Sequence, residues 1–189
     1  PLKKRVKKAK RDQADALISI HHNAKGSIVD VKDGAYVLVA SGNKKEHLSQ
    51  KEEQLGANIL NRISELGLKN RGLLRRLSET WSVYDNGRLS DYYAIVKGGI
   101  NENLLAVIIE HGYMDNLDEF NSYFSSDEKI QKVAEKDTQG IADYFHLTKD
   151  PQRTVRSTIQ KKIKITTVRD PEGKNNMSQT KTFQLSVSQ

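Results

Sequence analysis

Residues 16–24, Ala-Leu-Ile-Ser-Ile-His-His-Asn-Ala, form a short aliphatic run that ends in two histidines and an asparagine. An apolar run of this length, bounded by polar residues, predicts a buried strand of an α/β sheet. A second run, Leu-Leu-Ala-Val-Ile-Ile-Glu-His-Gly-Tyr at 104–113, also carries ionisable residues at its carboxyl end. Because ligands of open α/β sheets collect at the carboxyl ends of strands, we expect His21 and Glu110 to share one cleft.

Predicted strands and helices alternate around these two runs. We expect strands over 15–20, 35–40, 92–96 and 104–109, and helices over 2–14, 49–66, 116–124 and 127–145. Ser49 and Glu52 have the spacing of a capping box at the start of the second helix. This alternation predicts an α/β three-layer sandwich with a mostly parallel central sheet flanked by helices, covering residues 1–147.

Residues 148–189 differ in composition and are rich in Ser, Thr, Lys and Gln. Two alternating runs, at 162–168 and 182–187, flank the turn-forming sequence Asp-Pro-Glu-Gly at 170–173. We expect a basic linker followed by a short β-rich tail, either a partial hairpin or the start of a further domain.

The formal net charge of +7 comes from the two ends of the chain. Residues 1–11 contain seven Lys or Arg and no acid, whereas residues 12–149 contain 16 basic and 21 acidic residues, a net charge of −5. Basic ends can bind nucleic acid, an anionic membrane or an anionic cell-wall polymer, or can simply be solvated. The acidic middle argues against a nucleic-acid-binding module, so no nucleic-acid partner is expected.

Composition excludes further classes of protein. The absence of cysteine excludes disulfides, thiolate metal sites and cysteine nucleophiles. With a mean hydropathy of −0.68, the sequence has no apolar run near the roughly 20 residues that span a bilayer, so no integral membrane segment is expected.

An imidazole and a carboxylate at adjacent strand ends fit hydrolytic chemistry. His21 could bind a metal ion that activates water, and Glu110 could take the proton of that water and pass it to a leaving amine. In the alternative interpretation, His21 caps a strand and Glu110 pairs with a lysine. These two residues alone do not decide between the hydrolytic and the structural interpretation.

Residues 15–24, Asp-Ala-Leu-Ile-Ser-Ile-His-His-Asn-Ala, resemble the ADxxxSIHxNA motif of zinc-dependent N-acetylmuramoyl-L-alanine amidases, the amidase-3 family of cell-wall hydrolases. Residues 107–116, Val-Ile-Ile-Glu-His-Gly-Tyr-Met-Asp-Asn, resemble VLVExGFxxN of the same family. Three further segments occur in the same order as in the family: a helix before the first motif, a helix followed by Arg-Gly, and a closing helix. The resemblance therefore covers about residues 2–146.

The resemblance implies a zinc ligand at His21 and a general base and acid at Glu110. The implied reaction is hydrolysis of the peptidoglycan amide between N-acetylmuramic acid and L-alanine by zinc-activated water. The family holds Zn²⁺ with two His and one Glu, and the other two ligands belong to motifs that would precede Pro1. We therefore expect an amidase domain that lacks its N-terminal segment, and a 189-residue chain that binds zinc weakly and is inactive by itself.

Further residues are predicted to contact substrate. We place Asn23 and His111 at the rim of the cleft, and Trp81 and Tyr84 in a polar insertion that could contact glycan. His22 is expected to point away from the metal, although ligation by His22 or His111 stays open. Local packing is the alternative for the aromatic residues.

The resemblance implies a peptidoglycan partner and an extracellular or cell-wall location, or a cytoplasmic one until lysis if the protein is a phage endolysin. A monomer is favoured. The alternative function is a catalytically inactive relative that binds cell wall through the same cleft.

Overall fold

The computed structural model describes residues 2–24 and 33–149, and the backbone of two short strands at 162–164 and 180–182. The chain divides into two units, Pro1–Thr148 and Lys149–Gln189, one residue beyond the predicted boundary.

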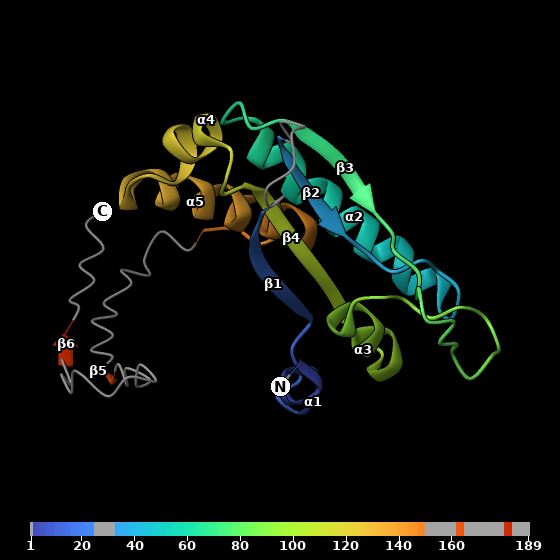
Figure 1. The fold of residues 1–189 in the computed structure, drawn as a ribbon. Coiled ribbons are helices and arrows are strands. Elements are labelled where there is room, and N and C mark those ends of the chain that lie inside the picture. Colours follow the sequence, from blue (N-terminus) through green and yellow to red (C-terminus); the bar gives the residue numbers. More distant parts are fainter. Residues whose placement is uncertain (1, 25–32, 150–161, 165–179, 183–189) are drawn as a thin grey trace, which may run out of the picture. The chain divides into compact units, whose positions relative to one another are not determined.

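The first unit alternates strands and helices (Figure 1). Its elements are α1 (Leu2–Arg11), β1 (Ala16–Asn23), β2 (Ala35–Leu38), α2 (Glu46–Ser64), β3 (Asn70–Leu74), α3 (Ala94–Glu102), β4 (Leu105–Tyr113), α4 (Leu117–Glu119), the π-helix η1 (Phe120–Phe124) and α5 (Asp127–Phe145). The strands form one sheet in the order β1-β4-β2-β3. β1 is parallel to β4 and β2 to β3, whereas β2 and β4 are antiparallel. The predicted α/β class with a mostly parallel sheet is therefore confirmed.

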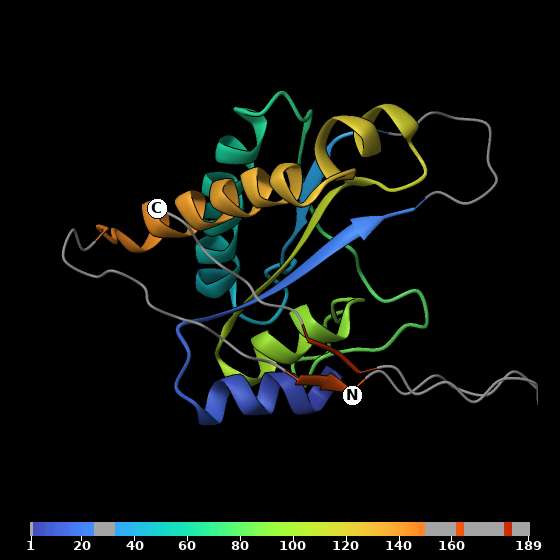
Figure 2. The ribbon, with the colours of Figure 1, turned by 90° about the vertical axis from the view of Figure 1, so that its left-hand side faces the viewer.

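Helices cover both faces of this sheet, which makes the three predicted layers. α1 and α3 lie together on one face, and α2 and α5 lie together on the other (Figure 2). Strand residues alternate between the two resulting cores because successive side chains of a strand point to opposite faces. In β4, Ala106 and Ile108 pack toward α1 and α3, whereas Val107 and Ile109 pack toward α2 and α5.

The sequence misplaced the start of the second helix. α2 begins at Glu46, and Ser49 and Glu52 are both buried instead of forming a capping box. The Ser49 hydroxyl donates to the carbonyl oxygen of Ala40 at 2.6 Å. The two carboxyl oxygens of Glu52 accept the backbone N–H groups of Ala40 at 2.8 Å and Ala106 at 3.0 Å. Glu52 thus ties α2 to the end of β2 and the start of β4.

The predicted strand at 92–96 is wrong, and a real strand, β3, was missed. The aromatic and β-branched residues at 92–96 favour a strand locally. However, Ile95, Val96 and Ile100 recur at helical spacing and are all buried in the core beneath α3. Burial of that helical face decides the conformation over local propensity.

The second unit contains β5 (Lys162–Lys164) and β6 (Thr180–Thr182), which pair antiparallel. β5 lies in the first predicted run and β6 ends at Thr182, where the second run was predicted to begin. The remainder of both predicted runs lies outside the described residues. Within the described residues, no helix combines the length and apolar character needed to cross a membrane.

Burial raises the pKa of Glu52 to about 7, against the opposing effect of the two backbone donors. The folded protein therefore holds a proton on Glu52 at pH values where the unfolded chain, with a pKa of 4.5, has released it. Stability linked to this group is complete below pH 4.5 and is lost as the pH rises through about 7.

We predict that Glu52→Gln removes this pH dependence, because the amide cannot ionise. Between pH 4.5 and about pH 8 the wild type should lose on the order of 3 kcal/mol of unfolding free energy more than the variant does. Urea unfolding at both pH values measures the difference. Glu135→Gln, at an exposed position of α5, is the control and should keep the wild-type slope. Equal slopes in wild type and Glu52→Gln would contradict the prediction.

Candidate active site

Three side chains from three adjacent strands lie in one row across the sheet. His21 of β1 is the register partner of Glu110 of β4, and Glu110 is also the register partner of Tyr36 of β2. Tyr36 and the residues that alternate with Glu110 pack on the α1 and α3 face, so the whole row belongs to that face. The predicted meeting of His21 and Glu110 at adjacent strand ends is confirmed.

The carboxyl group of Glu110 is half-buried and accepts no hydrogen bond among the described residues. Its Oε2 atom is buried and has no hydrogen-bond partner among the described residues. Burial raises the pKa of Glu110, and the nearby imidazoles of His21 and His111 partly oppose this effect. A buried carboxyl oxygen without a partner, next to an open imidazole, is suited to accept a proton from a bound molecule.

Tyr36 of β2 lies on the other side of this carboxyl group from His21, and Asn23 of β1 is hydrogen-bonded to Tyr36. The Asn23 side-chain amide nitrogen donates a hydrogen bond to the Tyr36 hydroxyl. The side-chain oxygen Oδ1 of Asn23 accepts a hydrogen bond from the backbone N–H of Ala24 at 2.8 Å. Burial and the charge of Glu110 raise the pKa of Tyr36, so its hydroxyl stays protonated at neutral pH. Asn23 is therefore placed beside the row, and its contact with substrate stays a prediction.

His21 presents an accessible imidazole at the edge of the sheet. The side chain is exposed, and its Nε2 atom lies 2.8 Å from the Ser19 hydroxyl, two residues earlier on the same face of β1. Its Nδ1 atom has no partner among the described residues, so the ring can still bind a further group.

His111 does not lie at the rim of the cleft, which corrects the prediction from sequence. Its side chain is 1% exposed and points to the opposite face of the sheet from Glu110. Nε2 lies 2.9 and 2.8 Å from the two carboxyl oxygens of Asp137 of α5, and Nδ1 lies 3.1 Å from the carbonyl oxygen of His21. Burial acts to lower the pKa of His111, but Asp137 outweighs it and the pKa is raised.

His22 also points to the opposite face, as expected for the neighbour of His21 on a strand. Its ring packs edge-on against Phe124 with ring centroids 4.4 Å apart, and its centroid lies 5.7 Å from that of His111. Burial lowers the pKa of His22, and the charge of His111 adds to this. The His22 ring thus contacts Phe124 while part of the residue stays exposed, and its lowered pKa favours the neutral form at physiological pH.

Trp81 and Tyr84 belong to a segment at the other end of the sheet, so the structure does not bring them to Glu110. Tyr84 is buried and donates to Asp91 at 2.6 Å, and Asp91 accepts the backbone N–H of Ser41, which follows β2. Glu110, by contrast, pairs with Tyr36 at the start of β2. A glycan contact by Tyr84 is thereby contradicted, whereas Trp81, 80% exposed, remains open to solvent.

The described residues do not form a zinc site by themselves. Within residues 2–24 and 33–149, no three His, Asp or Glu side chains are grouped so that they could hold a metal ion. Both ring nitrogens of His111 have partners and His22 faces away, which leaves His21 as the available imidazole. A protein zinc site normally has three or more protein ligands, so the residues present do not fit the ion.

Tyr36 and Asp137 were missed by the sequence reasoning. Tyr36 could have been found by alternation, because it is the polar-tipped residue on the same face as Leu38 in β2. Asp137 gave no local signal, because an aspartate in a helix is usually exposed and its partner lies 26 residues away.

We predict that Asp137→Ala lowers the free energy of unfolding by about 3 kcal/mol, because it leaves the buried His111 ring without its carboxylate. The double variant His111→Leu/Asp137→Leu should recover most of that loss, since an apolar pair can replace a buried ion pair. Thermal and urea unfolding of the three proteins measures both effects. A single variant as stable as the wild type would refute the buried pair.

Several solved structures resemble this chain. CwlD amidase from Clostridioides difficile, solved in complex with the GerS lipoprotein, superposes with a TM-score of 0.57 at 20% identity, over 77% of this chain and 61% of that one. Ami1 from Mycobacterium smegmatis gives 0.55 at 19% identity, over 77% and 60%. An N-acetylmuramoyl-L-alanine amidase from Clostridium difficile 630 gives 0.55 at 19%, over 77% and 66%. These similarities show the fold, and the chain spans about 60–66% of the three structures.

No curated protein matches the sequence. The model of the amidase-3 family, described as N-acetylmuramoyl-L-alanine amidase, matches residues 1–143, which is about three quarters of the chain. The chain therefore belongs to the amidase-3 family of N-acetylmuramoyl-L-alanine amidases.

Proposed function

We propose that this chain carries the proton-transfer half of a peptidoglycan amidase that cleaves the amide between N-acetylmuramic acid and L-alanine. The observation that supports this most directly is the Glu110 carboxyl group, half-buried beside His21 with one buried oxygen unpartnered. Membership of the amidase-3 family supplies the substrate class.

Glu110 is the general base and then the general acid. Its raised pKa brings it closer to neutral pH, so that it can take a proton from the attacking water and return it to the L-alanyl amine as the amide breaks. The protonated Tyr36 hydroxyl limits the space around this carboxyl group and provides a fixed neutral neighbour. These roles require only residues of this chain.

His21 would be one ligand of a Zn²⁺ ion, since it is the available imidazole among the described residues. Zinc, when bound, supplies Lewis-acid polarisation of the substrate carbonyl and of water. Because the described residues provide a single available imidazole, a bound ion would need further protein ligands from outside the described residues.

We predict that the 189-residue chain alone binds zinc weakly, with a dissociation constant above the micromolar range, and does not hydrolyse peptidoglycan. Titration with a competing fluorescent chelator measures the affinity, and His21→Ala should reduce what binding there is. Submicromolar binding together with peptidoglycan hydrolysis by this chain would overturn the incomplete-site proposal.

In a form of the protein that binds zinc tightly, we predict that Glu110→Gln lowers kcat by roughly 100-fold or more while zinc affinity is kept, because the amide cannot transfer a proton. Mass spectrometry of a muramyl-peptide digest detects the released L-alanyl amine. Glu102→Gln, a half-buried glutamate of α3, is the control and should retain activity. Undiminished cleavage by Glu110→Gln would exclude Glu110 as the base.

The second candidate is a cell-wall-binding relative without catalysis, which the incomplete set of metal ligands favours. The same zinc-binding form of the protein separates the two functions: retention on insoluble peptidoglycan without any released amine supports binding alone. In either case we propose a monomer without a nucleic-acid partner. It would act in the cell wall or outside the cell, or stay cytoplasmic until lysis if it comes from a phage.

A further inference from the structure

α1 concentrates positive charge that the rest of the domain does not neutralise. Its cations without an ion pair among the described residues are Lys3, Lys4, Arg5, Lys7 and Lys10. Only Lys8 and Arg11 are paired, both with Asp12. This density contrasts with the net charge of −5 over residues 12–149.

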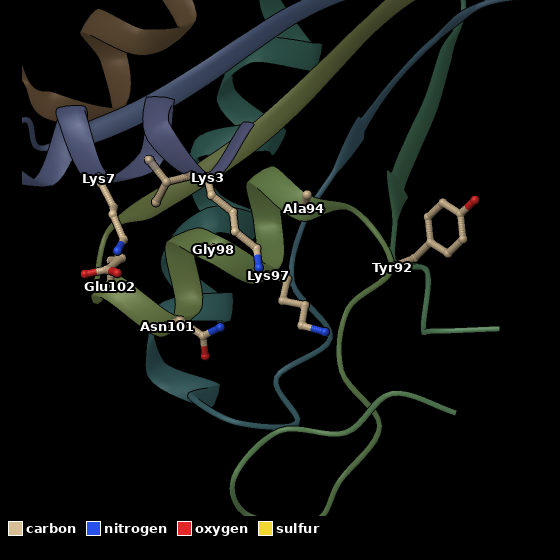
Figure 3. A pocket seen from close by; sticks show the side chains of 9 residues that line it. Lys3, Lys7, Tyr92, Ala94, Lys97, Gly98, Asn101 and Glu102 are labelled. Atoms are coloured by element: carbon tan, nitrogen blue, oxygen red, sulfur yellow. The ribbon is translucent and has the colours of Figure 1, made fainter. Parts of the chain in front are cut away.

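A groove between α1 and α3 gathers part of this charge (Figure 3). It has a volume of about 350 Å³ and is lined by Lys3 and Lys7 of α1 and by Lys97 and Glu102 of α3. Figure 3 shows the Lys3 side chain reaching over α3, with Lys7 and Glu102 pointing toward each other. The three lysines and Glu102 together give the groove a net charge of +2.

One cation of the groove is held in place, whereas two are free to adapt. The Lys97 ammonium donates to the hydroxyls of Ser82 at 2.8 Å and Ser90 at 2.9 Å, which fixes its position. Lys3 and Lys7 are exposed and make no hydrogen bond among the described residues. A fixed cation with two mobile ones at the edge suits an elongated ligand that carries repeated negative charges.

We propose that the groove between α1 and α3 binds a water-soluble, base-free phosphodiester polymer, of the polyol phosphate type. Each phosphate carries one negative charge that Lys3, Lys7 or Lys97 can neutralise. Because the polymer is flexible, its phosphates can reach these lysines without a rigid arrangement of the lysine side chains. This site is separate from the Glu110 row and does not depend on hydrolysis.

A membrane surface fits less well because α1 has no free apolar face. Val6 is 1% exposed and packs against Gly98 of α3, where an added Cβ atom would lie 3.0 Å from its side chain. Ala9 is half-buried against the same core, which leaves Leu2, 43% exposed, as the accessible large apolar residue of the helix. A helix that inserts into the lipid interface needs a continuous apolar face.

A nucleic acid fits less well because the aromatic ring that the groove offers for base stacking, although 45% exposed, already carries a cation on one face. Tyr92 is the aromatic residue that lines it, and the Arg76 guanidinium lies 4.0 Å from the centre of that ring. Tyr93 packs edge-on against Tyr92 with ring centroids 5.0 Å apart. Proteins that bind single-stranded nucleic acid usually stack the bases on exposed aromatic residues.

The test compares charge-removing variants of the full 189-residue chain by fluorescence anisotropy, with a labelled glycerol phosphate oligomer as probe. Lys3→Gln/Lys7→Gln should weaken binding roughly fivefold or more at low salt and reduce the slope of log K against log salt by about 1.4. Lys3→Arg/Lys7→Arg should bind like the wild type. Residues 150–189 are the same in all variants, so their charges cancel in the comparison.

Lys51→Gln/Arg88→Gln is the matched control, because both residues are exposed, form no ion pair among the described residues and lie away from the groove. It should bind like the wild type, and so should Glu110→Gln, which separates this site from the proposed amidase function. Equal losses in the two double variants, or absence of binding to the oligomer, would overturn the proposal. Tighter binding to a single-stranded DNA oligomer with the same number of phosphates, or to phosphatidylglycerol vesicles, would replace it with a nucleic-acid or membrane site.

Discussion

The parallel pairing of β1 with β4 is the constraint on which the site depends. It sets His21 directly beside Glu110, and a shift of one residue would turn one of them to the opposite face. β1 is an edge strand with no neighbour on its outer side among the described residues, so the sheet alone holds it from one side. The contact from Asp137 through His111 to the carbonyl oxygen of His21 adds a second attachment, from the α5 side.

Strand alternation gives neighbouring residues different roles in both motifs. In His21-His22 and in Glu110-His111, the first residue faces the α1 and α3 side and the second faces α2 and α5. The first residues keep accessible or unpartnered polar atoms, whereas His111 is fully committed to hydrogen bonds and His22 to ring packing. The dipeptides therefore combine one residue available for chemistry with one that fixes the backbone beneath it.

The sequence was sufficient to predict those features of the structure that depend on short-range patterns. The two strands, their neighbouring positions and the pair His21 and Glu110 follow from apolar runs that end in polar residues. His22 does face away from Glu110, as expected, and strand alternation accounts for this and would also have turned His111 away. The errors concern long-range packing: Ile95 and Val96 form a helix because its face is buried, and Tyr84 packs against Asp91 and the end of β2. Asp137 could be assigned only once α5 was placed against β4.

Charge separates the two sites that we assign to this domain. Glu110 and Tyr36 lie on the same face of the sheet as α1 and α3, so both sites belong to one side of the domain. The carboxylate of Glu110 repels phosphates and favours a neutral amide, whereas the lysines between α1 and α3 attract them. Because the packing of Val6 on α3 fixes the basic helix to the same layer, a wall polymer held there would leave the Glu110 row free for peptidoglycan. A polymer bound to the basic helix would thus not compete with a molecule bound beside Glu110.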